Sequence, residues 1–246
     1  MRYQFVDCRY ELGRPSRGRE LYRGGHIPGA SFLDLDTELS DPSVPDAGRH
    51  PLPDRTRFGE AAGRAGIGHG VFVVAYDQGM TGGAARLWWL LRHFGHEDVA
   101  VLAGGIAVWH GRLARGDERA EPATFEPRPR ADDTIDAAEL LRRLGDPGLV
   151  VVDARAPERY RGEVEPVDPV PGHIPGAVNV PYAAPELPRE VVEADEIVVY
   201  CGSGVTACVD LLALAEAGRP DARLYPGSWS DWSTRGLPVA SGAPAA

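Results

Sequence analysis

Short runs of apolar residues recur along the chain, and three of them lie at 71–76, 149–152 and 197–200. Each run is too short for a typical helix, and each lacks the polar alternation of a half-exposed strand. The pattern therefore predicts strands that are buried on both faces, as in parallel sheets.

Segments with helical patterns alternate with these strands. We expect helices over 84–94 and 205–217, which stop at Gly95 and Gly218 because glycine readily adopts the backbone conformation that ends a helix. Thr134 is expected to cap the start of a further helix. The alternation of strands and helices predicts an α/β fold with mainly parallel sheets flanked by helices on both faces.

An approximate internal repeat runs through the sequence. Gly-His-Ile-Pro-Gly-Ala at 25–30 recurs letter for letter at 172–177, and Val-Asp-Cys-Arg at 6–9 is echoed by Val-Asp-Ala-Arg at 152–155. Because the repeated elements keep their order, duplication of one domain explains them better than chance.

The repeat and the length of 246 residues together predict two tandem domains of ordinary size. We place the first domain at 1–115 and the second at 132–246. The intervening residues 116–131 are rich in proline and charge, which favours an extended linker.

The composition restricts the classes of binding partner and the cellular compartment that we expect for this protein. A formal net charge of −10 disfavours binding to nucleic acid and to anionic membranes. No apolar run reaches the length of a membrane span, and the first residues lack a signal-peptide pattern, so we expect a cytoplasmic protein. The three cysteines show neither a disulfide framework nor metal-ligand spacing. No metal or organic cofactor is implied, and a reactive thiol is left open.

Cys201 heads the most informative segment of the chain. It directly follows a buried strand, and the residues after it are rich in glycine. In α/β proteins, ligands bind where the carboxyl end of a strand meets the start of a helix, and glycines let backbone N–H groups converge on an anion. We therefore expect a thiolate at Cys201, with an anion site lined by Gly202, Gly204, Val205 and Thr206. An inert buried cysteine is the alternative.

This loop, the two copies of His-Ile-Pro-Gly-Ala and the two Val-Asp-x-Arg segments resemble tandem domains of the rhodanese superfamily over nearly the whole chain. The resemblance implies that Cys201 of the second domain accepts a sulfane sulfur as a persulfide. It also implies a small-molecule donor and a thiol or cyanide acceptor, with thioredoxin among the candidate thiols. Asp77 stands where the second copy has Cys201, and a carboxylate cannot form a persulfide, so we expect an inactive first domain.

The two residues after the cysteine bear on the donor. Gly202 and Ser203 resemble the branch of the family that uses 3-mercaptopyruvate, whereas the thiosulfate branch usually has Arg and Lys there. A dianionic donor gains more from adjacent cations than a monoanionic keto acid does. We expect a 3-mercaptopyruvate sulfurtransferase, with a thiosulfate sulfurtransferase as the alternative.

The resemblance also implies a proton relay. His50, in His-Pro-Leu-Pro at 50–53, matches a family motif whose histidine reaches the active site, and Asp36 matches its acidic partner. With Ser203 they are expected to move a proton during sulfur transfer. Asp34 competes with Asp36 for the acidic role, and a surface-loop histidine is the alternative for His50.

Arg159 matches the family arginine that grips the donor's carboxylate or sulfonate, and Arg161 is a neighbour that competes for the same role. A surface ion pair is the alternative for either arginine. The loop that follows, 163–171, lacks the second basic residue that the resemblance leads us to expect.

Two other functions compete with sulfur transfer. Phosphatases and arsenate reductases of the same fold need an arginine six places after the nucleophile, and this chain has Ala207 there. A non-catalytic thiol-relay or interaction module remains an alternative, although the intact loop around Cys201 argues against it.

Overall fold

A computed structural model describes residues 2–183 and 187–242. The chain divides into two compact units. The first unit comprises residues 1–41 and 52–130, and the second comprises 42–51 and 131–246. This division differs from the predicted boundaries at two places, because 42–51 packs with the second unit and most of the expected linker packs with the first.

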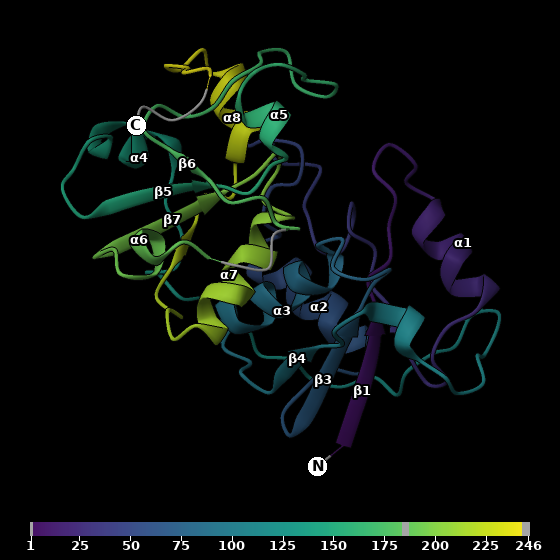
Figure 1. The fold of residues 1–246 in the computed structure, drawn as a ribbon. Helices are drawn as coiled ribbons and strands as arrows, with labels where there is room; N and C mark the ends of the chain where they lie inside the picture. The colour runs from purple at the N-terminus through teal and green to yellow at the C-terminus, as the bar shows by residue number, and fades with distance from the viewer. Residues whose placement is uncertain (1, 184–186, 243–246) are drawn as a thin grey trace. The chain divides into compact units, whose positions relative to one another are not determined.

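The first unit contains a parallel sheet of four strands in the order β2-β1-β3-β4. β1 and β3 lie side by side along their whole length (Figure 1). The strands are β1 (Arg2–Asp7), β2 (Ser31–Phe32), β3 (Val71–Tyr76) and β4 (Val99–Val101). The helices are α1 (Arg17–Gly24), α2 (Arg55–Arg64), α3 (Gly83–His93) and the short 3₁₀ helix η1 (Gly105–Val108).

The second unit repeats this topology, with a parallel sheet in the order β6-β5-β7-β8. Its strands are β5 (Leu149–Asp153), β6 (Val178–Asn179), β7 (Glu196–Tyr200) and β8 (Arg223–Leu224). Its helices are α4 (Ala137–Arg143), α5 (Pro157–Tyr160), α6 (Arg189–Val192), α7 (Ala207–Glu216) and α8 (Ser228–Thr234). The α/β class and the tandem parallel sheets are confirmed.

The second sheet is covered on both faces, as its uninterrupted apolar strands predict. On one face, Leu140 of α4, Tyr160 of α5 and Trp232 of α8 pack in one core with Val151 and Val198 of the sheet. α6 and α7 lie on the other side of β5 and β7 (Figure 1). The edge formed by the carboxyl ends of the strands therefore stays available for a site.

Most predicted elements are confirmed. α3 and α7 occupy the predicted helical segments, and Gly95 and Gly218 follow their last turns with positive φ angles of 85° and 89°. The expectation that Thr134 caps a helix is wrong. The cap is Asp136, whose carboxylate accepts a hydrogen bond from the Glu139 N–H (2.7 Å), while Thr134 pairs with β8.

A buried Asp–Arg pair lies at the carboxyl end of one inner strand of each sheet, β1 in the first and β5 in the second. In the second unit, the Asp153 carboxylate accepts hydrogen bonds from the Arg155 side chain (2.6 Å) and from the Tyr200 hydroxyl (2.6 Å). Asp7 and Arg9 form the same pair in the first unit (2.6 Å). Because the pair recurs in both units, its role in the fold does not depend on the cysteine loop.

The repeated histidines have the same structural character. His26 Nδ1 lies 2.8 Å from the Tyr22 carbonyl oxygen, and His173 Nδ1 lies 2.7 Å from the Tyr160 carbonyl oxygen. Each imidazole also stacks on that tyrosine ring. These contacts hold the His-Ile-Pro-Gly-Ala turn against the preceding helix.

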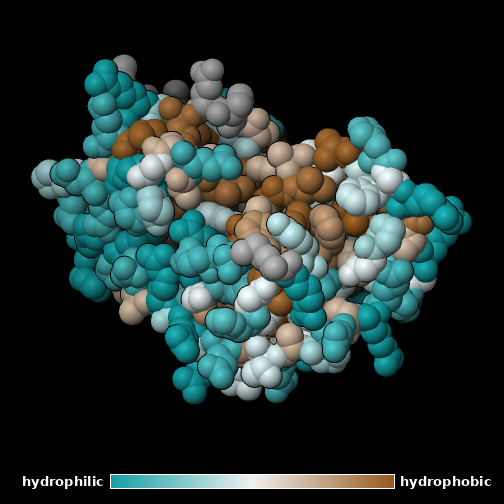
Figure 2. Space-filling model, turned by 90° about the horizontal axis from the view of Figure 1, so that it is seen from below, coloured by the Kyte–Doolittle hydropathy of each residue, from teal (hydrophilic) through white to brown (hydrophobic). Residues whose placement is uncertain are grey.

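One face of the surface is mostly hydrophilic, with apolar side chains gathered in smaller patches (Figure 2). Among the residues that the structure describes, no helix combines the length and the apolar character needed to cross a bilayer.

The Asp153–Arg155 pair yields a stability prediction. Replacing Asp153 by Ala strands a buried guanidinium and a buried tyrosine hydroxyl, and removing one partner of such a pair typically costs about 3–5 kcal/mol. We expect the Asp153→Ala variant to lose that much free energy of unfolding in urea titrations.

The control is Asp221→Ala. Asp221 also pairs with an arginine, Arg219, but 56% of the Asp221 side chain is exposed. We expect that variant to change by less than about 1 kcal/mol. Equal losses in the two variants would contradict the structural role of Asp153.

Candidate active site

Cys201 lies where β7 ends, at the carboxyl edge of the second sheet. The residue is 1% exposed. Its Sγ atom accepts a hydrogen bond from the Gly204 backbone N–H (3.2 Å), and its own N–H donates to the Ser228 hydroxyl (3.1 Å). The sulfur is thus held by a backbone donor inside a tight loop.

The loop needs glycine at position 204. Gly204 has a φ angle of +76°, and a Cβ atom there would lie 2.5 Å from the Pro226 carbonyl oxygen. Val205 is buried, and Thr206 immediately precedes α7 as its N-cap residue. The turn therefore brings the chain from the strand to the helix while the Gly204 amide faces the sulfur.

The corresponding loop of the first unit shows what this backbone binds. Asp77 follows β3 as Cys201 follows β7, and its carboxylate is buried. It accepts hydrogen bonds from the backbone N–H groups of Gly79 (2.8 Å), Thr81 (3.2 Å), Gly82 (3.2 Å) and Ala84 (3.2 Å). A loop of this type is an anion cradle, and in the first unit the chain's own carboxylate fills it.

The other two cysteines are poorly suited to nucleophilic chemistry. Burial, reinforced by the nearby Asp7 carboxylate, raises the pKa of Cys8 well above its usual range. Cys208 is completely buried on α7, and its thiol lies 3.4 Å from the Gly204 carbonyl oxygen. All three cysteines are free thiols.

Ser203 and His50 are brought together within the second unit. His50 Nδ1 lies 2.7 Å from Ser203 Oγ, and both side chains are buried. Their separation along the sequence is 153 residues, yet the segment 42–51 packs with the second unit and supplies the histidine. This hydrogen bond gives Ser203 a partner able to take up or release a proton.

The two acidic candidates for the relay lie in the first unit. Asp34 Oδ1 accepts hydrogen bonds from the N–H groups of Asp36 (3.0 Å) and Thr37 (3.0 Å), and from the Thr37 hydroxyl (2.9 Å). The Asp34 carboxylate is therefore engaged in capping its own turn. Asp36 remains the better candidate for the partner of His50, and that pairing stays a prediction.

The structure separates the two predicted anchoring arginines. Arg159 Nη2 donates to Glu165 (2.7 Å) and to Asp168 (3.2 Å), and its guanidinium lies close to Gly202 of the cysteine loop. Arg161 instead forms an ion pair with the exposed side chain of Glu163 (2.7 Å). Of the two, Arg159 is the one whose guanidinium lies beside the cysteine loop.

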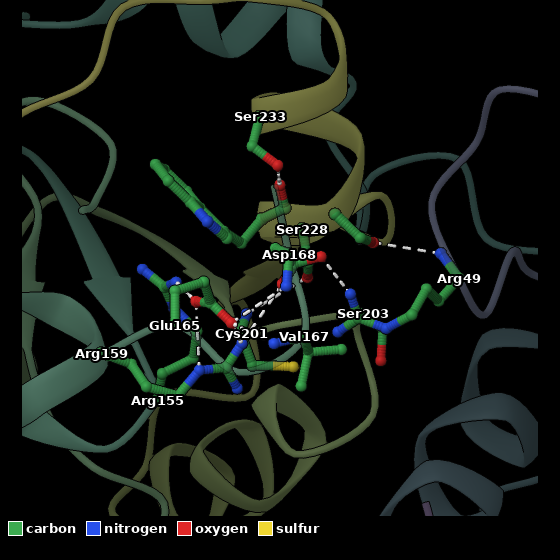
Figure 3. A network of polar contacts seen from close by, with 12 residues as sticks. Arg49, Arg155, Arg159, Glu165, Val167, Asp168, Cys201, Ser203, Ser228 and Ser233 are labelled. Atoms are coloured by element: carbon green, nitrogen blue, oxygen red, sulfur yellow. Dashed lines mark hydrogen bonds and ion pairs between the residues drawn. The ribbon is translucent and has the colours of Figure 1, made fainter. Parts of the chain in front are cut away.

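A third arginine, which the sequence analysis did not select, lies beside the same loop. Arg49 forms an ion pair with Asp168, and a Cβ atom on Gly202 would lie 2.8 Å from Arg49 Nη2. Figure 3 shows the Arg49 and Arg159 side chains approaching the cysteine loop from opposite sides. The available signal was its position next to His50, in the segment 40–55, which is rich in proline and aspartate.

The acidic loop 163–171 sets the charge balance of the site. Burial alone would raise the pKa of Glu165, but hydrogen bonds from Arg159 and from the Asp168 and Val167 amides outweigh it, and the net shift is downward. Burial raises the pKa of Asp168 although Arg49 opposes that shift. Glu165 is therefore a firmly ionised partner of Arg159, whereas Asp168 is a less stable carboxylate between two cations.

The family model for the rhodanese-like domain matches residues 1–112 and 136–235. The chain belongs to the rhodanese-like family. Both matched segments coincide with the sheets described above, so the rhodanese repeat accounts for the duplicated sequence motifs.

Several relatives of this chain are similar over most of its length. A Pseudomonas aeruginosa protein named "Probable 3-mercaptopyruvate sulfurtransferase" is 45% identical, covering 96% of this chain and 92% of that protein. The human 3-mercaptopyruvate sulfurtransferase is 38% identical, covering 96% of this chain and 86% of the human one. A Mycobacterium tuberculosis protein whose name assigns it to the thiosulfate sulfurtransferases, SseB, is 39% identical, covering 93% and 87%.

A solved structure supports the same assignment. The 3-mercaptopyruvate sulfurtransferase SseA from Escherichia coli superimposes with a TM-score of 0.79 at 34% identity, covering 93% of each chain. The rhodanese fold of the two units is thus shared with an experimentally determined structure.

The geometry of the cysteine loop predicts that one added methyl group at position 204 strongly slows sulfur loading. Replacing Gly204 by Ala forces a left-handed backbone onto an L-residue and drives Cβ into the Pro226 carbonyl, so the amide that faces the sulfur must move. We expect the rate of sulfur loading of Cys201 to fall by about 100-fold, as when one oxyanion donor is removed.

The matched control for this variant is Gly176→Ala. Gly176 has a similar φ angle of +80°, but a Cβ atom there meets nothing within 4 Å. It imposes the backbone strain without displacing the loop. Stopped-flow measurement of sulfur loading should separate the two variants, and identical rates would contradict the role of the Gly204 amide.

Proposed function

We propose that this protein is a sulfurtransferase that moves a sulfane sulfur from 3-mercaptopyruvate to a thiol or to cyanide through a persulfide on Cys201. The observation that carries the proposal is the Cys201 sulfur, held by a loop amide next to the hydrogen-bonded Ser203–His50 pair. The names of the Pseudomonas, human and Escherichia coli relatives support the same donor.

The first half-reaction loads the sulfur. The Cys201 thiolate attacks the sulfur atom of 3-mercaptopyruvate, an S–S bond forms and the C–S bond breaks. The electron pair of the broken bond leaves on the pyruvate enolate, which takes up one proton to give pyruvate. The product at the enzyme is the Cys201 persulfide, and the loop amides stabilise its terminal charge.

Ser203 and His50 supply the proton that the enolate needs. A hydroxyl held by an imidazole donates a hydrogen bond to the developing enolate oxygen, and the histidine replaces the proton that the serine gives up. Asp36 is proposed as the acidic group that orients the imidazole. Sulfite, the leaving group from thiosulfate, needs no such proton.

The second half-reaction returns the cysteine to its thiolate form. An acceptor thiolate attacks the outer sulfur of the persulfide, the S–S bond breaks, and Cys201 leaves as a thiolate. A thioredoxin-like dithiol suits this step, and a reducing compartment such as the cytoplasm keeps both partners as thiols. The cradle of the first unit, which is filled by Asp77, carries no sulfur in this proposal.

Thiosulfate is the second candidate donor. The guanidinium groups of Arg49 and Arg159 next to Gly202 provide positive charge, which favours the binding of a dianion such as thiosulfate. The Mycobacterium tuberculosis relative is also named as a thiosulfate sulfurtransferase. Both arginines, however, already face the carboxylate of Asp168, which offsets their charge. The loop itself supplies no cation at 202 or 203.

The donor preference tests the proposal. We expect a higher kcat/KM for 3-mercaptopyruvate than for thiosulfate, with cyanide as the common acceptor. We expect Ser203→Ala to lower kcat with 3-mercaptopyruvate by about 100-fold, because one donor to the developing oxyanion is lost. Turnover of thiosulfate should change much less.

Ser233→Ala is the control, because Ser233 is a buried serine of the same unit whose hydroxyl donates to the Trp229 carbonyl (2.7 Å). Loss of turnover with both donors in Ser233→Ala would indicate a structural effect of removing a buried hydroxyl. A wild-type preference for thiosulfate would overturn the donor assignment, and unchanged 3-mercaptopyruvate turnover in Ser203→Ala would overturn the proton role.

A further inference from the structure

A cavity of about 490 Å³ is built entirely from residues of the first unit. Its floor is apolar, because Phe32 of β2, Leu33, and Ala61 and Ala65 at the end of α2 line it. The segment 117–122 supplies a further part of the lining. None of these residues takes part in the reaction proposed at Cys201, so the cavity has no role in that function.

The charged side chains that line this cavity carry a positive excess. The described lining contains four arginines and three carboxylates, which are Arg19, Arg23, Arg64 and Arg119, and Glu38, Asp117 and Glu118. The formal net charge of the whole protein is −10. A local excess of cations on an otherwise acidic protein favours an anionic ligand.

Two of the three carboxylates are engaged by the first unit itself. Glu118 accepts a hydrogen bond from the Gly29 N–H (2.6 Å). Glu38 accepts hydrogen bonds from the Asp34 N–H (2.9 Å) and from Arg64 Nη2 (3.2 Å). Both carboxylates therefore hold backbone turns of the first unit, and Arg64 already has its counter-ion.

The third carboxylate, Asp117, is engaged by Arg23, whose Nε atom donates to both oxygens (3.1 and 3.0 Å). Arg19 approaches Asp117 only to 3.8 Å, and Arg119 forms no ion pair with a described residue. Hydrogen bonds from Arg23 lower the pKa of Asp117. The positive charges of Arg19 and Arg119 add to that shift, so both guanidinium groups lie near this carboxylate.

Arg19 is placed over the apolar floor. Its Cζ atom lies 4.8 Å from the centroid of the Phe32 ring. A guanidinium that lies over a ring keeps N–H groups that can donate to an oxyanion, and Arg19 donates no hydrogen bond to a described residue. Arg19 from α1 and Arg119 from the segment 117–122 thus bring two sets of unused donors to one apolar surface.

The number of unused donors favours a phosphate over a carboxylate. A carboxylate has two oxygens, and one bidentate guanidinium engages both of them. A phosphate monoester carries roughly two negative charges at neutral pH and has three acceptor oxygens, so it can accept from two guanidinium groups at once. The apolar floor matches an organic group attached to that phosphate, and the cavity has the size of an ordinary small-molecule site.

We propose that this cavity of the first unit binds a small organic phosphate monoester. The phosphate accepts hydrogen bonds from Arg19 and Arg119, and the organic group lies on Phe32 and Leu33. Binding here needs no persulfide chemistry, so it is independent of the function proposed above. The first unit, whose own cradle holds Asp77, then contributes a ligand site to the protein.

NMR titration of the full chain with phenyl phosphate tests the proposal, with the Phe32 and Leu33 amides as reporters. We expect these amides to shift and to saturate. We expect a Kd about 10-fold or more below that of inorganic phosphate, because the ring buries apolar area on the floor. Benzoate, which has the same ring with a carboxylate, should bind about 10-fold or more weakly than phenyl phosphate, because it engages one guanidinium.

Two variants test the arginines separately. We expect Arg19→Gln and Arg119→Gln each to raise the Kd of phenyl phosphate by about 10- to 100-fold, the worth of one charge-assisted hydrogen bond. Arg14→Gln is the matched control, because it changes the charge of the same unit equally. Arg14 pairs with Glu11 (3.2 Å) and does not line the cavity. We expect that variant to stay within about twofold of wild type.

Four results would overturn the proposal. The first is no shift of the Phe32 and Leu33 amides while the Gly202 amide shifts, which would assign the ligand to the cysteine loop. The second is the absence of binding to wild type. The third is equal affinity for phenyl phosphate and either benzoate or inorganic phosphate. The fourth is an equal effect of the Arg19→Gln and Arg14→Gln substitutions.

Discussion

Convergence of backbone N–H groups on one point, at the carboxyl end of a central strand, is the constraint on which this molecule depends. The polypeptide must turn from strand to helix with its amides directed inward, and an anion must then satisfy them. In the first unit the Asp77 carboxylate accepts four such amides. In the second unit the sulfur of Cys201 occupies the corresponding position. The duplicated fold thus places an acceptor for backbone amides at the same position in both copies, a structural carboxylate in the first and a sulfur atom in the second.

The charges around the second loop follow from this constraint. A site that stabilises an anionic sulfur and also binds an anionic donor needs cations, yet arginines left unpaired in a half-buried site would be costly. Glu165 and Asp168 reduce this cost because both form ion pairs with Arg159, and Asp168 also forms an ion pair with Arg49. Arg155, beneath them, links Glu165 to the buried Asp153. Acidic and basic side chains therefore alternate in one continuous network of ion pairs, which runs from Asp153 at the end of the strand to Asp168 and Arg49 beside the loop.

Much of this was predictable from the sequence, and the exceptions have physical reasons. Uninterrupted apolar runs, the repeated motifs and the glycine-rich loop were sufficient to predict the sheets, the duplication and the place of Cys201 at the end of a strand, because these features are local. The helix cap at Asp136 was assigned to Thr134, since both residue types accept amide hydrogen bonds and only the backbone decides between them. Arg49 escaped notice because its role depends on where a loop 152 residues before Cys201 packs, which no local pattern encodes. The choice between Arg159 and Arg161 likewise required knowing which one faces the loop.

The central claim is that Cys201 carries the transferred sulfur as a persulfide. Mass spectrometry of the protein after reaction with the sulfur donor tests this claim most directly. The protein is incubated with 3-mercaptopyruvate without an acceptor, alkylated and digested, and the three cysteine peptides are compared. The account predicts one added sulfur atom on the Cys201 peptide, none on the Cys8 or Cys208 peptides, and release of that sulfur on addition of cyanide. An added sulfur on Cys8 or Cys208, or none on Cys201 while pyruvate is produced, would contradict it.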